Sequence, residues 1–260
     1  MKKLICIAFA LAVGATLSAA PKKKAPKDSV GFTFTDVNLV KTTPVKDQNK
    51  SGTCWCFSSN SFYEDEILRK TGKVIDLSEM FPVRLCYDEK ADRFVRRYGV
   101  AQFSQGGSGL DVPYIWAKYG AMPEEAYKGL NYGEDKHVHG EVESLLSGYV
   151  KTIVRKPNRR VSTAWRKGFN GILDAYFGEI PDSFVYEGKT YTPKTFAASL
   201  PINVNDYIAL TSFTHHPFYQ PFELEVSDNW LNGQFYNLPL EELKAVVDNA
   251  LENGYSVDWA

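Results

Sequence analysis

Cysteine is scarce in this sequence, with four residues among 260. Cys6 lies in an N-terminal segment that has the features of a cleaved signal peptide, so three remain: Cys54, Cys56 and Cys86. An odd number of cysteines in an exported protein leaves at least one free thiol. The sequence therefore excludes a scaffold that depends on disulfide bonds for its fold.

Long apolar runs are also missing. After residue 20 no stretch approaches the roughly 20 apolar residues that a membrane-spanning helix needs. The run 4–13 is shorter than that, follows Lys2 and Lys3, and leads to the small residues 18–20, which is the pattern of a signal peptide over residues 1–20. We expect an exported protein, periplasmic or extracellular, that has no membrane contact after signal cleavage.

The chain has no excess of either charge, with 30 Lys and Arg against 31 Asp and Glu. Its one basic run, Lys22 to Lys24, falls in residues 21–30, where little can pack and a disordered leader is predicted. A balanced chain without a basic face is not expected to bind nucleic acid.

Three helices are predicted from uninterrupted segments with stop signals. They cover residues 54–70 before Thr71-Gly72, 110–119 before Gly120, and 240–251 between Pro239 and Asn253-Gly254. Residues 155–160 and 181–194 have the composition of loops, and 202–217 combine a short apolar run with turns.

The last residues, 255–260, alternate apolar and polar side chains, which predicts a half-buried strand. The strand stops at Ala260 without turn residues or a polar tail. An edge strand is an awkward terminus, so we expect the sequence to be truncated there.

One short segment has the composition of a nucleophile site. It contains Gln48, Gly52, Cys54 and Trp55, and Cys54 begins the predicted helix. Acyl transfer by a thiol needs a thiolate, donors for the oxyanion and a base for the leaving amine. The helix dipole favours a thiolate at Cys54, Gly52 permits a tight turn, and the Gln48 amide with the Cys54 N–H can hold the oxyanion.

This segment resembles the active-site region of papain-like cysteine peptidases, which place the oxyanion-hole glutamine six residues before the nucleophile. Leu77-Ser78-Glu79 resembles a motif that follows the nucleophile helix in that family. Gln105-Gly106-Gly107 resembles the family's double glycine, so the likeness implies that Gly106 and Gly107 bind the substrate backbone. Tyr119-Gly120, with Pro123 and Tyr127 after it, resembles the next turn of the same lobe.

Within the family, the closer likeness is to bleomycin hydrolase and bacterial aminopeptidase C. Ser51 stands where papain has a cysteine, residues 130–239 resemble the long insertion of that subgroup, and residues 236–239 precede a similar helix. The likeness covers about residues 32–260 and is strongest in its first hundred residues.

The resemblance implies an α+β, papain-like fold. Its helical first lobe would occupy residues 31–130, and residues 131–260 would hold the insertion and the start of an incomplete β-rich second lobe. The implied function is peptide-bond hydrolysis through a Cys54 acyl-enzyme, acting on peptides or unfolded proteins from the amino end or internally. No metal or organic cofactor is expected.

One part of the family pattern is missing. The catalytic thiol needs a histidine oriented by an asparagine, which in the family commonly precedes Ser-Trp-Gly, and no Asn-Ser-Trp occurs here. In the bleomycin hydrolase subgroup both residues come later than Ala260. We therefore expect the chain by itself to be inactive.

Several alternatives stay open. In one alternative, Cys54 is an ordinary buried cysteine. In another, Cys54 and Cys56 form a metal-binding or redox pair, although a single intervening residue on a helix makes the two side chains point apart. Cys56 and Cys86 are predicted to be core residues. Two functions of other classes are a non-catalytic peptide-binding relative and an exported metal-binding protein.

The metal-binding alternative would use four histidines: His137, His139, His215 and His216. We predict a surface loop around the first two and a turn at His215-His216-Pro217, where one imidazole would replace the missing base.

Overall fold

The structure is a computed structural model that describes residues 31–259. The predicted signal peptide (1–20) and basic leader (21–30) lie outside these residues. The described residues up to 37 belong to a separate unit, and the fold described below is that of the compact unit that begins at residue 38. None of the helices in the described range is both long and apolar enough to cross a bilayer.

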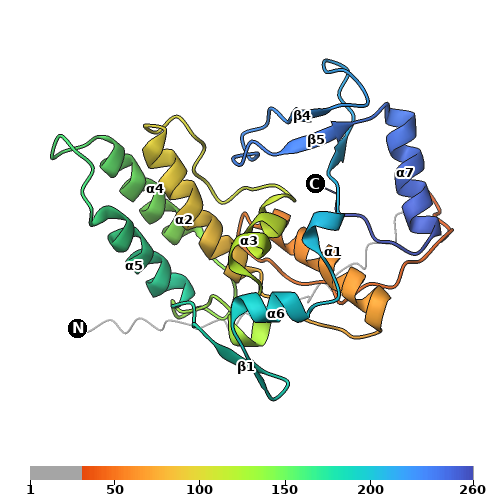
Figure 1. Cartoon of the computed structure of the whole chain (residues 1–260), viewed down its shortest axis with the longest axis horizontal. Coiled ribbons are helices and arrows are strands. Elements are labelled where there is room, and N and C mark those ends of the chain that lie inside the picture. Colours follow the sequence, from red (N-terminus) through yellow and green to blue (C-terminus); the bar gives the residue numbers. More distant parts are fainter. Residues whose placement is uncertain (1–30, 260) are drawn as a thin grey trace, which may run out of the picture. The chain divides into compact units, whose positions relative to one another are not determined.

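Helices dominate the first part of the compact unit and short strands follow (Figure 1). The elements described are α1 Cys54–Thr71, α2 Met80–Arg96, α3 Asp111–Tyr119, the 3₁₀ turn η1 Glu124–Ala126, α4 Gly140–Val154, α5 Trp165–Phe177, β1 Phe184–Tyr186, β2 Lys189–Tyr191, α6 Pro193–Ser199, η2 Val204–Asp206, β3 Leu210–Thr211, β4 Pro221–Glu223, β5 Gln234–Asn237 and α7 Leu240–Glu252.

The central helix is α1, which contacts α3 and buries residues on most of its circumference. It ends as predicted, because Gly72 takes a left-handed conformation with φ of 73° and donates its N–H to the Leu68 carbonyl oxygen at 2.7 Å. The predictions for α3 and α7 are confirmed in the same way, within a residue at each end. A helix buried on most sides gives its first residue a fixed position.

A buried ionic cluster anchors the chain just before the predicted site. Lys46 Nζ lies 2.6 Å from Glu64 Oε1 on α1 and 2.7 Å from Glu79 Oε1. Burial by itself would lower the pKa of Lys46, but the carboxylates of Glu79 and Glu64 together raise it. Burial raises the pKa of Glu79 to about 7 in spite of Lys46. The Leu77-Ser78-Glu79 motif thus fixes the segment that leads into the site.

Helices α2, α4 and α5 lie side by side (Figure 1). The buried side chains of α5 recur every fourth residue: Trp165, Phe169, Leu173 and Phe177. This spacing places one apolar stripe along the helix. Arg166 adds two hydrogen bonds to Asp88 of α2, at 3.0 and 2.7 Å.

The strands form two small sheets. One has the order β3-β5-β4, with β3 parallel and β4 antiparallel to β5. The other is the antiparallel hairpin β1-β2. The hairpin corrects the loop predicted over 181–194, because Glu187 (φ 46°) and Gly188 (φ 76°) make a two-residue turn that pairs the flanking residues. The α+β prediction is confirmed, and the proposed lobe boundary near residue 130 stays a prediction.

The predicted strand over 255–260 is wrong for the residues described. Residues 255–259 pair with no strand, and their burial alternates in the opposite phase to the one expected. Asp258 faces inward and accepts hydrogen bonds from the hydroxyls of Ser58 and Ser59 on α1, whereas Trp259 is 72% exposed. Polar contacts to α1 therefore override the apolar pattern in this segment.

Candidate active site

Cys54 is the first residue of α1 and is exposed. The preceding residue, Thr53, is fully buried, and its carbonyl oxygen accepts the N–H of Cys56 at 2.9 Å. The first N–H groups of a helix have no partner inside the helix, and the Cys54 N–H makes no hydrogen bond among the described residues. An accessible sulfur and a free amide N–H therefore lie together at a helix N-terminus.

Gln48 belongs to a turn that is closed by reciprocal hydrogen bonds. Its Nε2 donates to the Ser51 carbonyl oxygen at 2.7 Å, and Ser51 Oγ donates to the Gln48 carbonyl oxygen at 2.9 Å. Ser51 Oγ also lies 2.7 Å from Thr53 Oγ1. A primary amide carries two hydrogens, so one holds the side chain in place and the other is left to bind a substrate oxygen.

The same turn is held by a segment distant in sequence. The Lys50 N–H donates to the His137 carbonyl oxygen at 3.0 Å, and the His139 N–H donates to the Lys50 carbonyl oxygen at 3.1 Å. The surface loop predicted around these histidines is wrong, because His137 is 9% and His139 0% exposed. Their rings pack against each other and against Phe57 and Phe177, contacts between distant segments that local sequence does not reveal.

Gly52 is where Gln105 approaches the nucleophile turn. The Gly52 N–H donates to Gln105 Oε1 at 2.7 Å, and a Cβ on Gly52 would lie 3.0 Å from Gln105 Cβ. Trp55 Nε1 donates to the Gln105 carbonyl oxygen at 2.9 Å. Gly52 does not adopt a positive φ, so what its missing side chain permits in this turn is the close approach of Gln105.

Gly106 and Gly107 continue the chain from Gln105. A Cβ on Gly107 would lie 2.5 Å from Asp111 Oδ2 and 2.8 Å from the Trp55 ring, so that face of the backbone is packed against the protein. A Cβ on Gly106 would meet the carboxylate of Asp228, 2.5 Å from its Oδ1. Gly107 thus lies beside Trp55 and Gly106 beside Asp228, and the contact of the two glycines with substrate stays a prediction.

Buried charges beneath this segment were not predicted from the sequence. Lys90 donates to the Gly106 carbonyl oxygen, and its Nζ lies 5.6 Å from the Trp55 ring centre and 5.7 Å from that of Trp230. Trp230 Nε1 donates to Asp111 Oδ2 at 2.6 Å. Burial raises the pKa of Asp111 to about 6, and Lys90 opposes that rise. Lys90 and Asp111 occupy ordinary helix positions in the sequence, so only the packed structure reveals them.

Asp228 lies beside Gly106. It is partly exposed, and its carboxylate accepts a hydrogen bond from Gln102 Nε2 at 3.3 Å as its one side-chain partner among the described residues. A carboxylate beside Gly106 with so few partners can attract a cation on a ligand.

The described residues bring no imidazole into a hydrogen bond with Cys54. His215 and His216 lie in the predicted turn and bind Glu225 instead. The four-histidine metal set is not assembled, because the one group of potential metal ligands found in the described range contains neither His137 nor His139.

The remaining thiols have other environments. Cys56 is 0% exposed and Cys86 is 1% exposed, and burial raises the pKa of both well above its usual value. Both are core residues, as predicted. Cys54 is thus the one accessible thiol of the described residues.

Comparison with known proteins matches this site to one family. The sequence model of the papain family cysteine proteases matches residues 33–158. Digestive cysteine proteinase 1 of Homarus americanus is 39% identical over 67 residues, which are 22% of this chain and 21% of that protein. Human cathepsin L2 is 51% identical over 37 residues, 14% and 11% of the two chains. These matches span about a fifth or less of the relatives' lengths.

A solved structure extends the likeness of the fold beyond those residues. PepW from Lactobacillus rhamnosis HN001 superposes with a TM-score of 0.68 at 18% identity, over 86% of this chain and 59% of that one. At this identity the superposition establishes a shared fold, which includes the residues after 158.

Proposed function

The chain belongs to the papain family of cysteine proteases, and we propose on that premise that it is the nucleophile-bearing part of an exported cysteine peptidase. The observation that carries the proposal is the position of Cys54, an accessible thiol at the start of a buried helix with a free N–H beside it. The Gln48 amide, already held by one hydrogen bond, supplies the second oxyanion donor.

In the proposed reaction, Cys54 Sγ attacks the carbonyl carbon of a peptide bond. The negative charge that forms on the carbonyl oxygen is held by the Cys54 N–H and the Gln48 amide. Collapse of this intermediate expels the amine and leaves an acyl group on Cys54, which water then removes. The proton of the thiol passes to a histidine and then to the leaving amine. The family resemblance implies that this histidine is oriented by an asparagine.

We further propose the aminopeptidase C or bleomycin hydrolase type, which acts on peptides with a free amino end. The support comes from Asp228, whose carboxylate lies beside Gly106. If an extended peptide pairs with the Gly106 backbone, its α-ammonium group can reach this carboxylate. An endopeptidase has no need of an anion at that position, because its substrate continues there and has no α-ammonium group.

Asp228→Asn tests the amino-end preference in the enzyme as its native source makes it. We expect kcat/KM for peptides with a free amino group to fall by about fivefold, because an ion pair to a partly exposed carboxylate contributes on the order of 1 kcal/mol. N-acetylated peptides serve as the control, because they carry no ammonium group and their rates should not change. Equal loss for both kinds of substrate would contradict the assignment.

The peptidase proposal itself is tested by labelling. Protein from its native source is treated with a peptidyl epoxide that alkylates activated thiols, and its intact mass and labelled peptide are measured. We expect one label, on Cys54, because Cys56 and Cys86 are buried. No label, or a label distributed over the three cysteines after partial unfolding, would contradict an activated nucleophile.

A second candidate function is a non-catalytic peptide-binding relative. It is favoured by one observation, which is that Cys54 is hydrogen-bonded to no histidine among the described residues. A protein of this kind would bind peptides through Gly106 and Gly107 and stay unlabelled in the epoxide experiment.

A further inference from the structure

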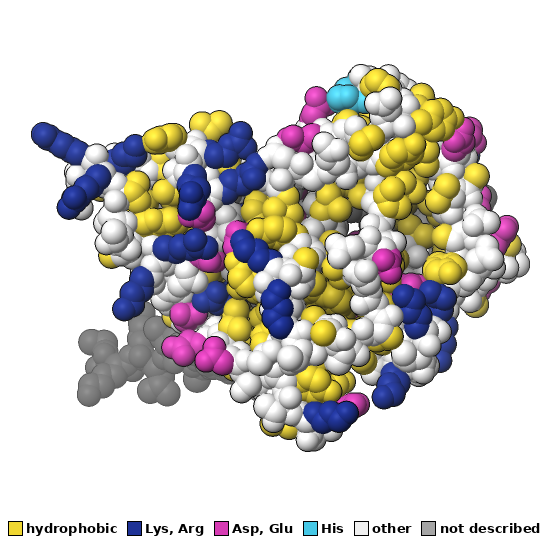
Figure 2. Space-filling view, viewed as in Figure 1, with side chains coloured by type: hydrophobic (Ala, Val, Ile, Leu, Met, Phe, Trp, Pro, Cys, Tyr) yellow, Lys and Arg dark blue, Asp and Glu magenta, His cyan; other side chains and the backbone are white. Residues whose placement is uncertain are grey.

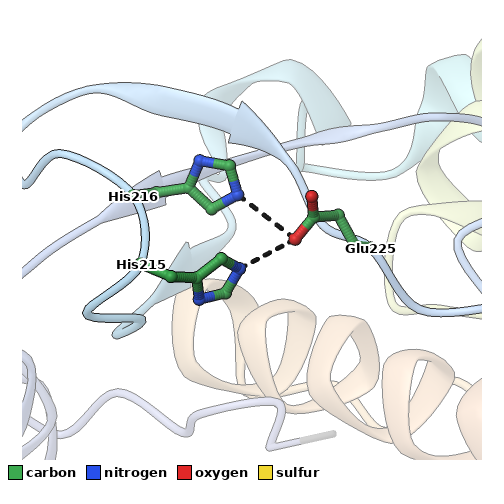
Figure 3. Close-up of side chains that lie close together, drawn as sticks. All are labelled: His215, His216 and Glu225. Atoms are coloured by element: carbon green, nitrogen blue, oxygen red, sulfur yellow. Dashed lines mark hydrogen bonds and ion pairs between the residues drawn. The ribbon is translucent and has the colours of Figure 1, made fainter.

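Two histidines and a glutamate converge at one end of the sheet β3-β5-β4 (Figure 3). His215 and His216 belong to the turn between β3 and β4, and Glu225 follows β4 by two residues. Both imidazole Nε2 atoms point to the same carboxylate oxygen, Glu225 Oε2, at 2.8 Å from His215 and 3.2 Å from His216. The three groups therefore meet without any rearrangement of the chain.

The backbone that carries the histidines is fixed by a residue that is not part of the cluster. Asn237, at the end of β5, is 0% exposed. Its Oδ1 accepts the Phe213 N–H at 2.8 Å, and its Nδ2 donates to the carbonyl oxygens of Phe213, His216 and Pro217 at 2.9 to 3.2 Å. The turn is thus held against the sheet by a buried amide.

The imidazole rings are also oriented independently of the glutamate. The His216 ring is stacked on Phe222 of β4, with the centres 4.0 Å apart and the planes inclined by 19°. The His215 ring lies edge-on to Phe213 at 5.5 Å. These contacts restrict the rotation of the two rings, which lowers the entropy that a bound ion would have to remove.

The spacing of the three ligand atoms suits a small divalent ion. Zinc binds imidazole nitrogen and carboxylate oxygen at about 2.0–2.2 Å, and in a tetrahedral site two such ligands lie roughly 3.3 Å apart. The two nitrogen–oxygen distances differ from that value by only about 0.1–0.5 Å, and all three ligand atoms lie within 4.8 Å of one another. Small outward shifts of exposed side chains would admit the ion.

We propose that His215, His216 and Glu225 bind one divalent transition-metal ion of the zinc class, with water as the fourth ligand. Two imidazoles and one carboxylate are a donor set that such ions prefer over calcium or magnesium, which take oxygen ligands.

The cluster lies at the surface, so an ion bound there would be in contact with solvent. The side chains are 54%, 27% and 62% exposed for His215, His216 and Glu225. On the face shown in Figure 2, an imidazole reaches the surface beside an acidic side chain at this end of the molecule. The ion would join the β3–β4 turn to the end of β4 and keep one coordination position open to solvent. This site is separate from Cys54 and does not depend on the proposed peptidase function.

The test measures zinc binding by the protein as its native source makes it, carrying Cys54→Ala, so that the exposed thiol cannot bind the metal. We expect one Zn²⁺ per chain by calorimetry, and four-coordinate Co²⁺ absorption when cobalt replaces zinc. Glu225→Gln keeps the shape of the side chain but removes its charge, and we expect it to weaken Zn²⁺ binding by about tenfold or more, as should His216→Ala.

Glu241→Gln is the matched control, because Glu241 is an exposed glutamate on α7 whose side chain pairs only with Lys244 among the described residues. It should leave zinc affinity unchanged. Glu225 is exposed and His216 is half-buried, so each variant is expected to fold, and its melting temperature verifies this. Zinc binding that is absent, not stoichiometric, or retained in both Glu225→Gln and His216→Ala would overturn the proposal.

Discussion

Cys54→Ala is expected to abolish peptide hydrolysis by the enzyme as its native source makes it, with kcat/KM reduced by about 10⁴-fold or more. The reason is that the acyl-enzyme route needs the sulfur as its nucleophile, and neither the helix N-terminus nor Gln48 can replace it. The measurement is steady-state hydrolysis of a peptide substrate by purified parent and variant. Because Cys54 is exposed at the start of α1, its Sγ contributes little packing and the variant should fold normally.

Cys86→Ala is the control for this experiment. It also removes one thiol, but from the core of the protein, where Cys86 is 1% exposed. We expect it to lower the free energy of unfolding and to leave the turnover of each folded molecule unchanged. Turnover that persists in Cys54→Ala would mean that another group performs the chemistry, and the assignment of Cys54 would be wrong.

The local features of the site could be predicted from the sequence because they depend on neighbouring residues. Helix α1 has a clear start at Cys54 and a clear stop at Gly72, and the interval from Gln48 to Cys54 is a local distance along the chain. The hairpin β1-β2 could also have been predicted. Its signal is the Glu187-Gly188 pair between two short aromatic-rich segments.

Features made by distant segments could not be predicted in this way. The burial of Lys90 and Asp111 depends on Trp55 and Trp230, which come from opposite ends of the described chain. Asp258 shows the same limit, because it turns inward only where the α1 hydroxyls are in reach. Alternation along one segment predicts a period, but the tertiary partner decides which phase of that period is buried.

His139 gives the second large expected effect, on stability in acid. Its side chain is fully buried, and neither ring nitrogen has a hydrogen-bond partner among the described residues. Burial lowers its pKa from 6.5 to about 4, with a smaller contribution from His137. The unfolded chain therefore takes up a proton near pH 6.5, whereas the folded chain does so only near pH 4.

The sign of the effect follows from this difference. Between about pH 6.5 and pH 4 the unfolded state binds more protons, so the folded state loses stability as the pH falls, by about 3 kcal/mol in all. His139→Leu removes the titrating group and keeps an apolar side chain in the same space. We expect the parent to lose about 2–3 kcal/mol more than this variant between pH 7.5 and pH 4.5, measured by urea denaturation.

Other buried groups titrate in the same pH range, but their contributions to the free energy of unfolding are common to parent and variant and cancel in the difference between the two proteins. Asp111 and Glu79 have raised pKa values, about 6 and about 7, so their ionisation destabilises the fold as the pH rises, which is the opposite direction. Both groups are present in parent and variant. Phe177→Leu, which changes the ring packed 5.3 Å from His139, is the control for lost packing and should lower stability at both pH values while the parent's loss of stability in acid persists.

The acid effect should also reach the nucleophile turn. The His139 N–H and the His137 carbonyl oxygen are hydrogen-bonded to the backbone of Lys50, two residues after Gln48. Protonation of the buried His139 ring favours states in which residues 137–139 leave the core, and the nucleophile turn then loses its two hydrogen bonds to them. Hydrogen-exchange protection of the backbone amides of Lys50 and of residue 139 should therefore fall between pH 7.5 and pH 4.5 in the parent and stay higher in His139→Leu. Equal protection and equal urea midpoints in the two proteins at pH 4.5 would show that the imidazole does not govern this part of the fold.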